Sequence, residues 1–293
     1  MAENTAIEFL GEISLQCIAA SSRAALYEEK AFRECLLTEL GHFVNSGGEL
    51  VSFDVFDTVL LRNTKCETRR FLEIAERCSS LVYSHTGRSI EPTVMLIARL
   101  GATEISYRLS QPVRGCREGS LNEIHLGVAR RLNLPDELAK QFVAEEVRYE
   151  METLTLNPWF RSAADMIQTS GLKITFISDM YMSGKDIAEL IDGKASTDFG
   201  PNSVYSSGDL KISKKSGLLF DYVAQRFGVE AGRAIHLGDN IETDYRCARS
   251  RGWMALYLPH TVSEREAIAR DEQLVLAEIE DKGFDLKLFG DHR

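Results

Sequence analysis

Three aspartates from two distant parts of the chain have the residue type and the placement to do chemistry together. Asp54 directly follows an apolar run at 50–53, and Asp239 and Asp244 follow a second apolar run that ends at Gly238. A carboxylate at the end of a buried strand is costly to remove from water unless a cation pairs with it. Three such groups can surround a hard divalent ion, so the sequence predicts a cation site, with Mg2+ as the best candidate.

These residues need a scaffold that brings strand ends together. After residue 156 the chain alternates between helical and strand patterns, with strands expected at 173–177, 203–206, 234–238 and 254–258. This alternation predicts an α/β, Rossmann-like core in which helices cover both faces of a parallel sheet. Sites on such sheets lie at the carboxyl ends of the strands, so Asp54, Ser178 and Asp239 should meet there.

The order of the patterns divides the chain into four parts. Residues 62–156 are helical almost throughout, which is too long for a crossover between strands and predicts an inserted all-α domain. The expected parts are a helical N-terminal leader at 1–48, an α/β core at 49–62 and 157–260, a helical insert at 63–156, and a C-terminal helix and tail at 261–293. The leader should pack on the main body or on a second copy, which makes a homo-oligomer through the N-terminal helices one expectation.

Composition argues against several classes of protein. The chain has 293 residues, enough for a sizeable core, and its 34 basic and 44 acidic residues give a net charge of -10. That charge disfavours nucleic acid as a partner. The six cysteines show no paired or metal-finger spacing, which is typical of reduced thiols. No apolar stretch approaches the ~20 residues that cross a bilayer, and the acidic N-terminus is unlike a secretory signal, so we expect a cytoplasmic protein without membrane contact.

The motifs and their order resemble the haloacid dehalogenase (HAD) superfamily. That family carries a nucleophilic Asp with a Thr four residues later, then a Ser or Thr after a strand, a Lys, and a paired-Asp motif. Here these fall on Asp54 with Thr58, Ser178, Lys214, and Asp239 with Asp244. Lys211 and Lys215 compete for the Lys position. The sequences around Asp54, Ser178 and Asp239 are also similar to predicted HAD hydrolases that accompany surface-polysaccharide pathways.

The resemblance implies a Mg2+-dependent phosphohydrolase that acts on a small phosphorylated metabolite, with a sugar phosphate as one candidate. Asp54 would attack phosphorus and form an aspartyl-phosphate. The metal ligands would be Asp54, Asp239, Asp244 and the backbone carbonyl of Phe56. The phosphate would be bound by Thr58, Ser178 and Lys214, and the substrate would meet Arg62 and Tyr181 near the helical insert, which would be the cap. We expect His236, inside a strand pattern, to be a core residue.

One position departs from the family pattern. Most HAD phosphatases have a second Asp two residues after the nucleophile, where it acts as general acid and base, but this chain has Phe56 there and Asp57 one place later. Asp57 could take over, a carboxylate of the insert could do so, or hydrolysis could be poor, since losing such a group costs about 10^2 to 10^4 in rate. Two alternatives therefore stay open: a catalytically weak phosphate-binding or regulatory module, and a dehalogenase-like C–X hydrolase.

Overall fold

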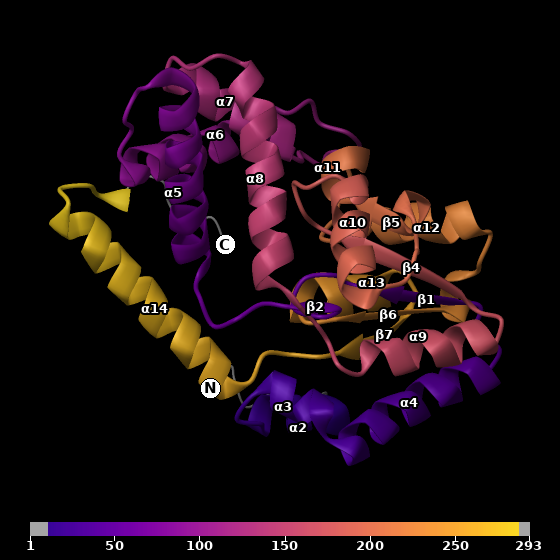
Figure 1. Ribbon diagram of the computed structural model, residues 1–293. Coiled ribbons are helices and arrows are strands. Elements are labelled where there is room, and N and C mark those ends of the chain that lie inside the picture. Colours follow the sequence, from indigo (N-terminus) through magenta and orange to yellow (C-terminus); the bar gives the residue numbers. More distant parts are fainter. Residues whose placement is uncertain (1–10, 287–293) are drawn as a thin grey trace.

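A five-stranded parallel sheet forms the centre of the protein. The computed structural model describes residues 11–286 (Figure 1), and the predictions for 1–10 and 287–293 lie outside them. The sheet order is β5-β4-β1-β6-β7, and all neighbouring strands run parallel. The bounds are β1 Leu50–Phe53, β4 Lys173–Ser178, β5 Val204–Ser206, β6 Ala234–Gly238 and β7 Met254–Tyr257. The predicted α/β, Rossmann-like core is therefore confirmed.

Both faces of the sheet are buried because the strands are apolar on both sides. On one face Phe53 packs among the aromatic rings of Phe160 and Phe176, beneath α9 (Phe160–Thr169) and α10 (Gly184–Ala195). On the other face Leu50 shares a core with α12 (Leu218–Phe227) and α13 (Cys247–Ser250). Burial on both faces is typical of parallel sheets. The short helices η1 (Pro201–Ser203), α11 (Ser207–Leu210) and η2 (Ala231–Arg233) complete the connections, and a π-helical turn, η3 (Ile241–Arg246), leads into α13.

Four long helices follow the first strand and form a helical insert beside the sheet (Figure 1). They are α5 (Glu67–Thr86), α6 (Pro92–Leu109), α7 (Leu121–Arg131) and α8 (Glu137–Thr153). The insert joins the core through an antiparallel pair of two-residue strands, β2 (Leu60–Leu61) and β3 (Thr155–Leu156). Sequence reasoning did not predict this pair, because two residues are too few to show an alternating pattern.

The ends of the described chain pack against the rest of the molecule. The N-terminal helices α2 (Glu12–Ala19), α3 (Arg23–Glu28) and α4 (Lys30–Asn45) lie beneath the core, and α14 (Val262–Asp281) runs from the core to α5 (Figure 1). Ser14 Oγ donates to the Tyr257 carbonyl, 2.8 Å away, and Leu36 and Leu40 are fully buried. The apolar side of the N-terminal helices is therefore occupied within the chain, and an oligomer through them stays a prediction.

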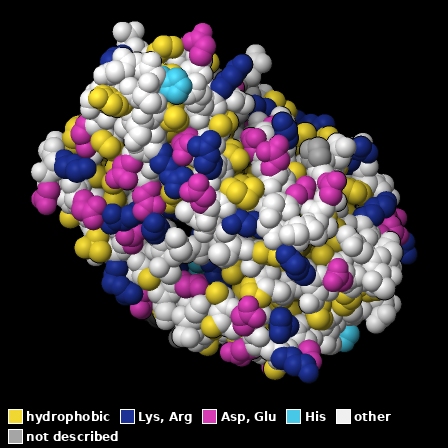
Figure 2. Space-filling view, in the orientation of Figure 1, with side chains coloured by type: hydrophobic (Ala, Val, Ile, Leu, Met, Phe, Trp, Pro, Cys, Tyr) yellow, Lys and Arg dark blue, Asp and Glu magenta, His cyan; other side chains and the backbone are white. Residues whose placement is uncertain are grey.

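Charged side chains of both signs are interspersed over the face of the molecule shown in Figure 2. Within residues 11–286, no helix combines the length and the apolar composition that crossing a bilayer requires.

Candidate active site

The three predicted aspartates meet at the carboxyl edge of the sheet. Asp54 lies directly after β1 and Asp239 directly after β6, and these strands are parallel neighbours. Asp244 comes from η3 and turns back toward them. One carboxylate oxygen from each residue lies within 4.8 Å of the other two. A Cβ at position 238 would lie 2.4 Å from Asp244 Cγ, so Gly238 is what allows Asp244 to fold back.

Lys214 is the cation inside this cluster. Its Nζ donates to Asp54 Oδ1 and to Asp244 Oδ1, both at 2.6 Å. Asp179, the residue after Ser178, holds the loop in place because its carboxylate accepts the Lys214 backbone N–H at 2.6 Å. Of the competing lysines, Lys215 is exposed and Lys211 Nζ donates to the Glu118 carbonyl at 3.0 Å. The structure therefore places Lys214 at the acids.

The acids carry more negative charge than Lys214 can neutralise. Burial raises the pKa of the Asp54 carboxyl well above its usual range; the Lys214 ammonium opposes this shift, and Asp244 and Asp239 add to it. Burial likewise raises the pKa of Asp239. Buried carboxylates held close together with one lysine are stabilised by a further cation.

The donor set fits a hard divalent ion. Carboxylate oxygens are the ligands that Mg2+ prefers, and the ligands of an octahedral Mg2+ lie about 3 to 4 Å apart, which the 4.8 Å limit on the three oxygens accommodates. Asp54, Asp239 and Asp244 could therefore hold the ion, with the Phe56 carbonyl as the further ligand that the resemblance implies.

The two predicted hydroxyl groups are buried at the same edge. Ser178 ends β4 and is 2% exposed. Thr58 is also buried, and its Oγ1 has no hydrogen-bond partner among the described residues. Buried polar atoms without a partner are uncommon in native proteins. The Thr58 hydroxyl is thus free to donate to a bound group, whereas its predicted role in phosphate binding stays a prediction.

Asp57 is held in an ion pair and does not point free into the site. It adopts a left-handed backbone with φ of 62°. Its Oδ1 lies 2.9 Å from Arg23 Nη2, and its Oδ2 lies 3.6 Å from Arg62 Nη1. Burial would raise the pKa of Asp57, but Arg62, Arg23 and His260 outweigh it and hold that pKa well below its usual range. This environment opposes the expected role of Asp57 as a proton donor.

Arg62 and Tyr181 lie between the core and the insert. The Arg62 guanidinium stacks over the Phe56 ring at 4.3 Å and approaches Glu150 of α8 at 3.3 Å. Tyr181 donates its hydroxyl to Glu146 Oε1 at 2.9 Å. Both residues thus lie at the boundary between the insert and the strand ends. Each already contacts a glutamate of the insert, Arg62 with Glu150 and Tyr181 with Glu146.

The site also contains two histidines, His236 and His260, which the sequence did not predict to be part of it. His236 is fully buried, as expected of a core residue, but its Nε2 lies 3.3 Å from Asp244 Oδ1. His260, in the loop after β7, has its Nε2 3.2 Å from Asp239 Oδ2. The only available signal was position, since His236 and His260 lie on or just after strands next to β1 and β6.

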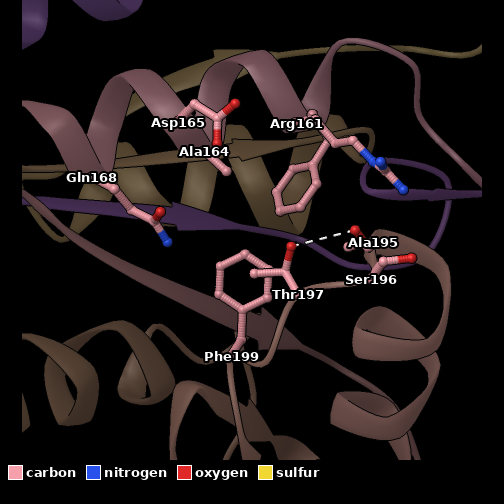
Figure 3. A pocket seen from close by; sticks show the side chains of 9 residues that line it. Arg161, Ala164, Asp165, Gln168, Ala195, Ser196, Thr197 and Phe199 are labelled. Atoms are coloured by element: carbon pink, nitrogen blue, oxygen red, sulfur yellow. Dashed lines mark hydrogen bonds between the residues drawn. The ribbon is translucent and has the colours of Figure 1, made fainter.

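The hollow shown in Figure 3 lies away from these acids. It is formed by α9 and the end of α10, with Phe160, Arg161 and Phe199 among its walls, and Thr197 Oγ1 donates to the Ala195 carbonyl at 3.3 Å. None of the predicted site residues lines it. It therefore plays no part in the chemistry of the acid cluster.

Comparisons with known proteins bear on the family. Residues 211–281, which include Lys214, Asp239 and Asp244, match the family model described as HAD-hydrolase-like. This match confirms the predicted resemblance to HAD hydrolases over that part of the chain, whereas Asp54 and Ser178 lie outside it. No curated protein matches the sequence.

Several solved structures are similar in fold. A 2-haloacid dehalogenase from Pseudomonas syringae pv. Tomato DC3000 is 16% identical, with 76% of this chain and 98% of that chain covered and a TM-score of 0.47. A HAD family enzyme from Bacteroides thetaiotaomicron, in complex with magnesium and inorganic phosphate, is 10% identical, with 72% and 94% covered and a TM-score of 0.45. At such identities and scores, nothing about activity is transferred from these proteins.

Proposed function

We propose that this HAD-like chain is a Mg2+-dependent phosphohydrolase that acts on a small phosphorylated metabolite through an aspartyl-phosphate. One observation carries the proposal: Asp54, Asp239 and Asp244 bring carboxylate oxygens within 4.8 Å of one another, and Lys214 Nζ lies 2.6 Å from Asp54 and from Asp244. Phosphoryl transfer depends mainly on positioning and on neutralising negative charge, and this cluster does both.

Each residue has a role that follows from its place. Asp54 attacks phosphorus in line, the bond to the leaving oxygen breaks, and water later releases phosphate from Asp54. Lys214 and the hydroxyl groups of Ser178 and Thr58 hold the phosphoryl oxygens. When bound, Mg2+ neutralises charge between the carboxylate and the phosphate, and Asp54, Asp239, Asp244 and the Phe56 carbonyl would hold it.

We also propose that the helical insert is a cap that closes over the strand ends. It enters and leaves the core through β2 and β3, and it faces the site with Arg62 and Tyr181 at the boundary. Caps exclude water and supply substrate contacts.

We propose that the chain divides into a leader at 1–48, a core at 49–62 and 157–260, a cap at 63–156, and a C-terminal part at 261–293. All six cysteines are free, which fits a reducing cytoplasm.

The experiment is phosphate release from an aryl phosphate with and without Mg2+. We expect Mg2+-stimulated turnover that Asp54→Asn abolishes, because the amide cannot attack phosphorus. Glu152→Gln, an exposed change on α8, is the matched control and should keep full activity. Turnover that is equal in the wild type and Asp54→Asn across a panel of phosphomonoesters would overturn the proposal, and halide release in the presence of a chelator would favour a dehalogenase instead.

A second candidate is a phosphate-binding module with slow hydrolysis. The observation that favours it is the ion pair of Asp57 with Arg23, which leaves Phe56 as the residue at the general-acid position. This module would bind Mg2+ and a phosphate mimic such as beryllofluoride with little turnover. Calorimetric titration of both, beside the activity assay, separates the two candidates.

A further inference from the structure

Arg23, from the N-terminal helices, reaches the turn that follows the nucleophile. Its side chain is 3% exposed. Nη1 donates to the Asp57 carbonyl at 2.7 Å and Nη2 to Asp57 Oδ1 at 2.9 Å. One guanidinium therefore holds both the main chain and the side chain of the same residue.

That residue is conformationally unusual. Asp57 has φ of 62°, a region that non-glycine residues rarely occupy and that persists only where the surroundings fix it. The two bonds from Arg23 provide such a restraint. The restrained turn begins at Phe56, two residues after Asp54, and the Phe56 carbonyl is an expected metal ligand.

Arg23 is itself oriented by the C-terminal helix. Glu264, in the first turn of α14, accepts from Arg23 Nε at 2.7 Å and from the Arg23 backbone N–H at 2.9 Å. Glu264 also lies 3.9 Å from His260 Nδ1, and the other nitrogen of His260 faces Asp239. These polar groups thus form a chain of contacts from the turn after Asp54, through Arg23 of the N-terminal helices and Glu264 of α14, to Asp239 of the paired-Asp motif.

We propose that Arg23 is a positioning residue of the active site, and that the N-terminal helices and α14 together clamp the turn at Phe56 and Asp57 from outside the α/β core. The inference deepens the proposed function, on which its metal readout rests. A buried ion pair of this kind is weak evidence for stability alone, because desolvation offsets most of the attraction between the charges.

The test compares Arg23→Met with Arg69→Met. Arg69 is a matched control because it also pairs with carboxylates of α14, Asp271 at 2.7 Å and Glu278 at 2.9 Å, but on the helical insert. Two properties are measured on the full chain: Mg2+ affinity by calorimetry without substrate, and amide hydrogen exchange across residues 55–61. Arg23→Lys and Glu264→Gln are milder variants for the case that Arg23→Met does not fold.

We expect Arg23→Met to weaken Mg2+ binding about 10-fold or more, as loss of a residue that orients metal ligands does. The amides of Asp57, Val59 and Leu60, which are hydrogen-bonded within the turn, should exchange faster. Arg23→Lys should recover the exchange protection only in part, because an ammonium cannot reproduce the bidentate contact that the guanidinium makes with the Asp57 carbonyl and side chain. Arg69→Met should change neither property.

The outcomes separate this inference from the proposed function. Equal Mg2+ affinity and equal exchange at 55–61 in the two methionine variants would overturn the positioning role, even in an active enzyme. If the wild type releases no phosphate while both properties still respond to Arg23, the proposed hydrolysis fails and the clamp stands. If the wild type binds no Mg2+, hydrogen exchange alone decides the clamp.

Discussion

At the scale of single residues, Phe56 is where the chain departs from the pattern of HAD phosphatases. It occupies the position that the resemblance assigns to a general acid and base, and the guanidinium of Arg62 covers its ring at 4.3 Å. The nearest carboxylate in sequence, Asp57, is occupied by Arg23. The position where HAD phosphatases carry a second Asp therefore holds an aromatic ring under a guanidinium in this chain.

We expect Phe56→Asp to raise turnover, by about 10^2 or more for substrates with poor leaving groups, because a carboxyl at this position can transfer a proton. The measurement is kcat for aryl phosphates that span a range of leaving-group acidity. Phe56→Leu is the control, since it alters packing without adding a proton donor, and equal turnover in both variants would argue that another residue already supplies the proton.

Much of the site was predictable from the sequence, because helical segments alternate with short apolar runs and the end of each run marks the end of a strand. Asp54, Ser178 and Asp239 follow runs that are apolar on both faces, and parallel pairing brings such ends to one edge. The contact of Arg23 with Asp57 and Glu264 was not predictable. Asp57 is 34 positions from Arg23 in the sequence, and Glu264 is 241 positions from it. Helical periodicity indicates that Arg23 lies on a helix, but it does not indicate which side chains Arg23 contacts.

At the scale of elements, a buried polar network joins the insert to the core. Glu146 of α8 is 1% exposed and binds Arg99 of α6, His125 of α7 and Tyr181 of the core. Burial would raise the pKa of Glu146, but Arg99 and His125 outweigh it and hold that pKa well below its usual range. The stability of the folded state therefore depends on Glu146 being ionised.

This linkage predicts a pH effect with a definite sign. A carboxyl whose pKa is lower in the folded state contributes stability above its unfolded pKa, about 4.3 for Glu, and that contribution is lost as the pH falls below it. Glu146→Gln should lower the free energy of unfolding at pH 7 by about 3–5 kcal/mol, because it leaves Arg99 buried without its counter-charge. As the pH falls, the free energy of unfolding should also decrease less in Glu146→Gln than in the wild type.

Urea unfolding at pH 7 and at pH 4 measures both effects. Glu152→Gln is the control on the same helix: its carboxylate is half exposed and pairs with Arg77, so the change should cost at most about 1 kcal/mol. If the two variants lost the same stability at pH 7, the network at Glu146 would not hold the insert in the way described.

At the scale of the whole molecule, the insert is attached on two sides by contacts of different character. On one side Tyr181 binds Glu146 through its hydroxyl, and its carbonyl accepts the Leu121 N–H at 2.7 Å, all within the buried interface. On the other side α14 runs along the molecule to α5 (Figure 1), where Arg69 pairs with Asp271 and Glu278 close to solvent. If the insert is the cap that we propose, it has to release one of these sides first when it opens for substrate.

Salt should distinguish the two sides. At 1 M ionic strength the Debye length falls to about 3 Å, and this screening weakens the attraction between exposed charges far more than between buried ones. We expect 1 M NaCl to speed amide exchange at the start of α5, where the Cys66 N–H donates to Asp271 Oδ2 at 2.9 Å, and to leave the Leu121 amide protected. Asp271→Asn at low salt should reproduce the first effect. Equal loosening at Leu121 would instead mean that the insert moves as one body on both attachments, and the side at α14 could then not be the one that opens first.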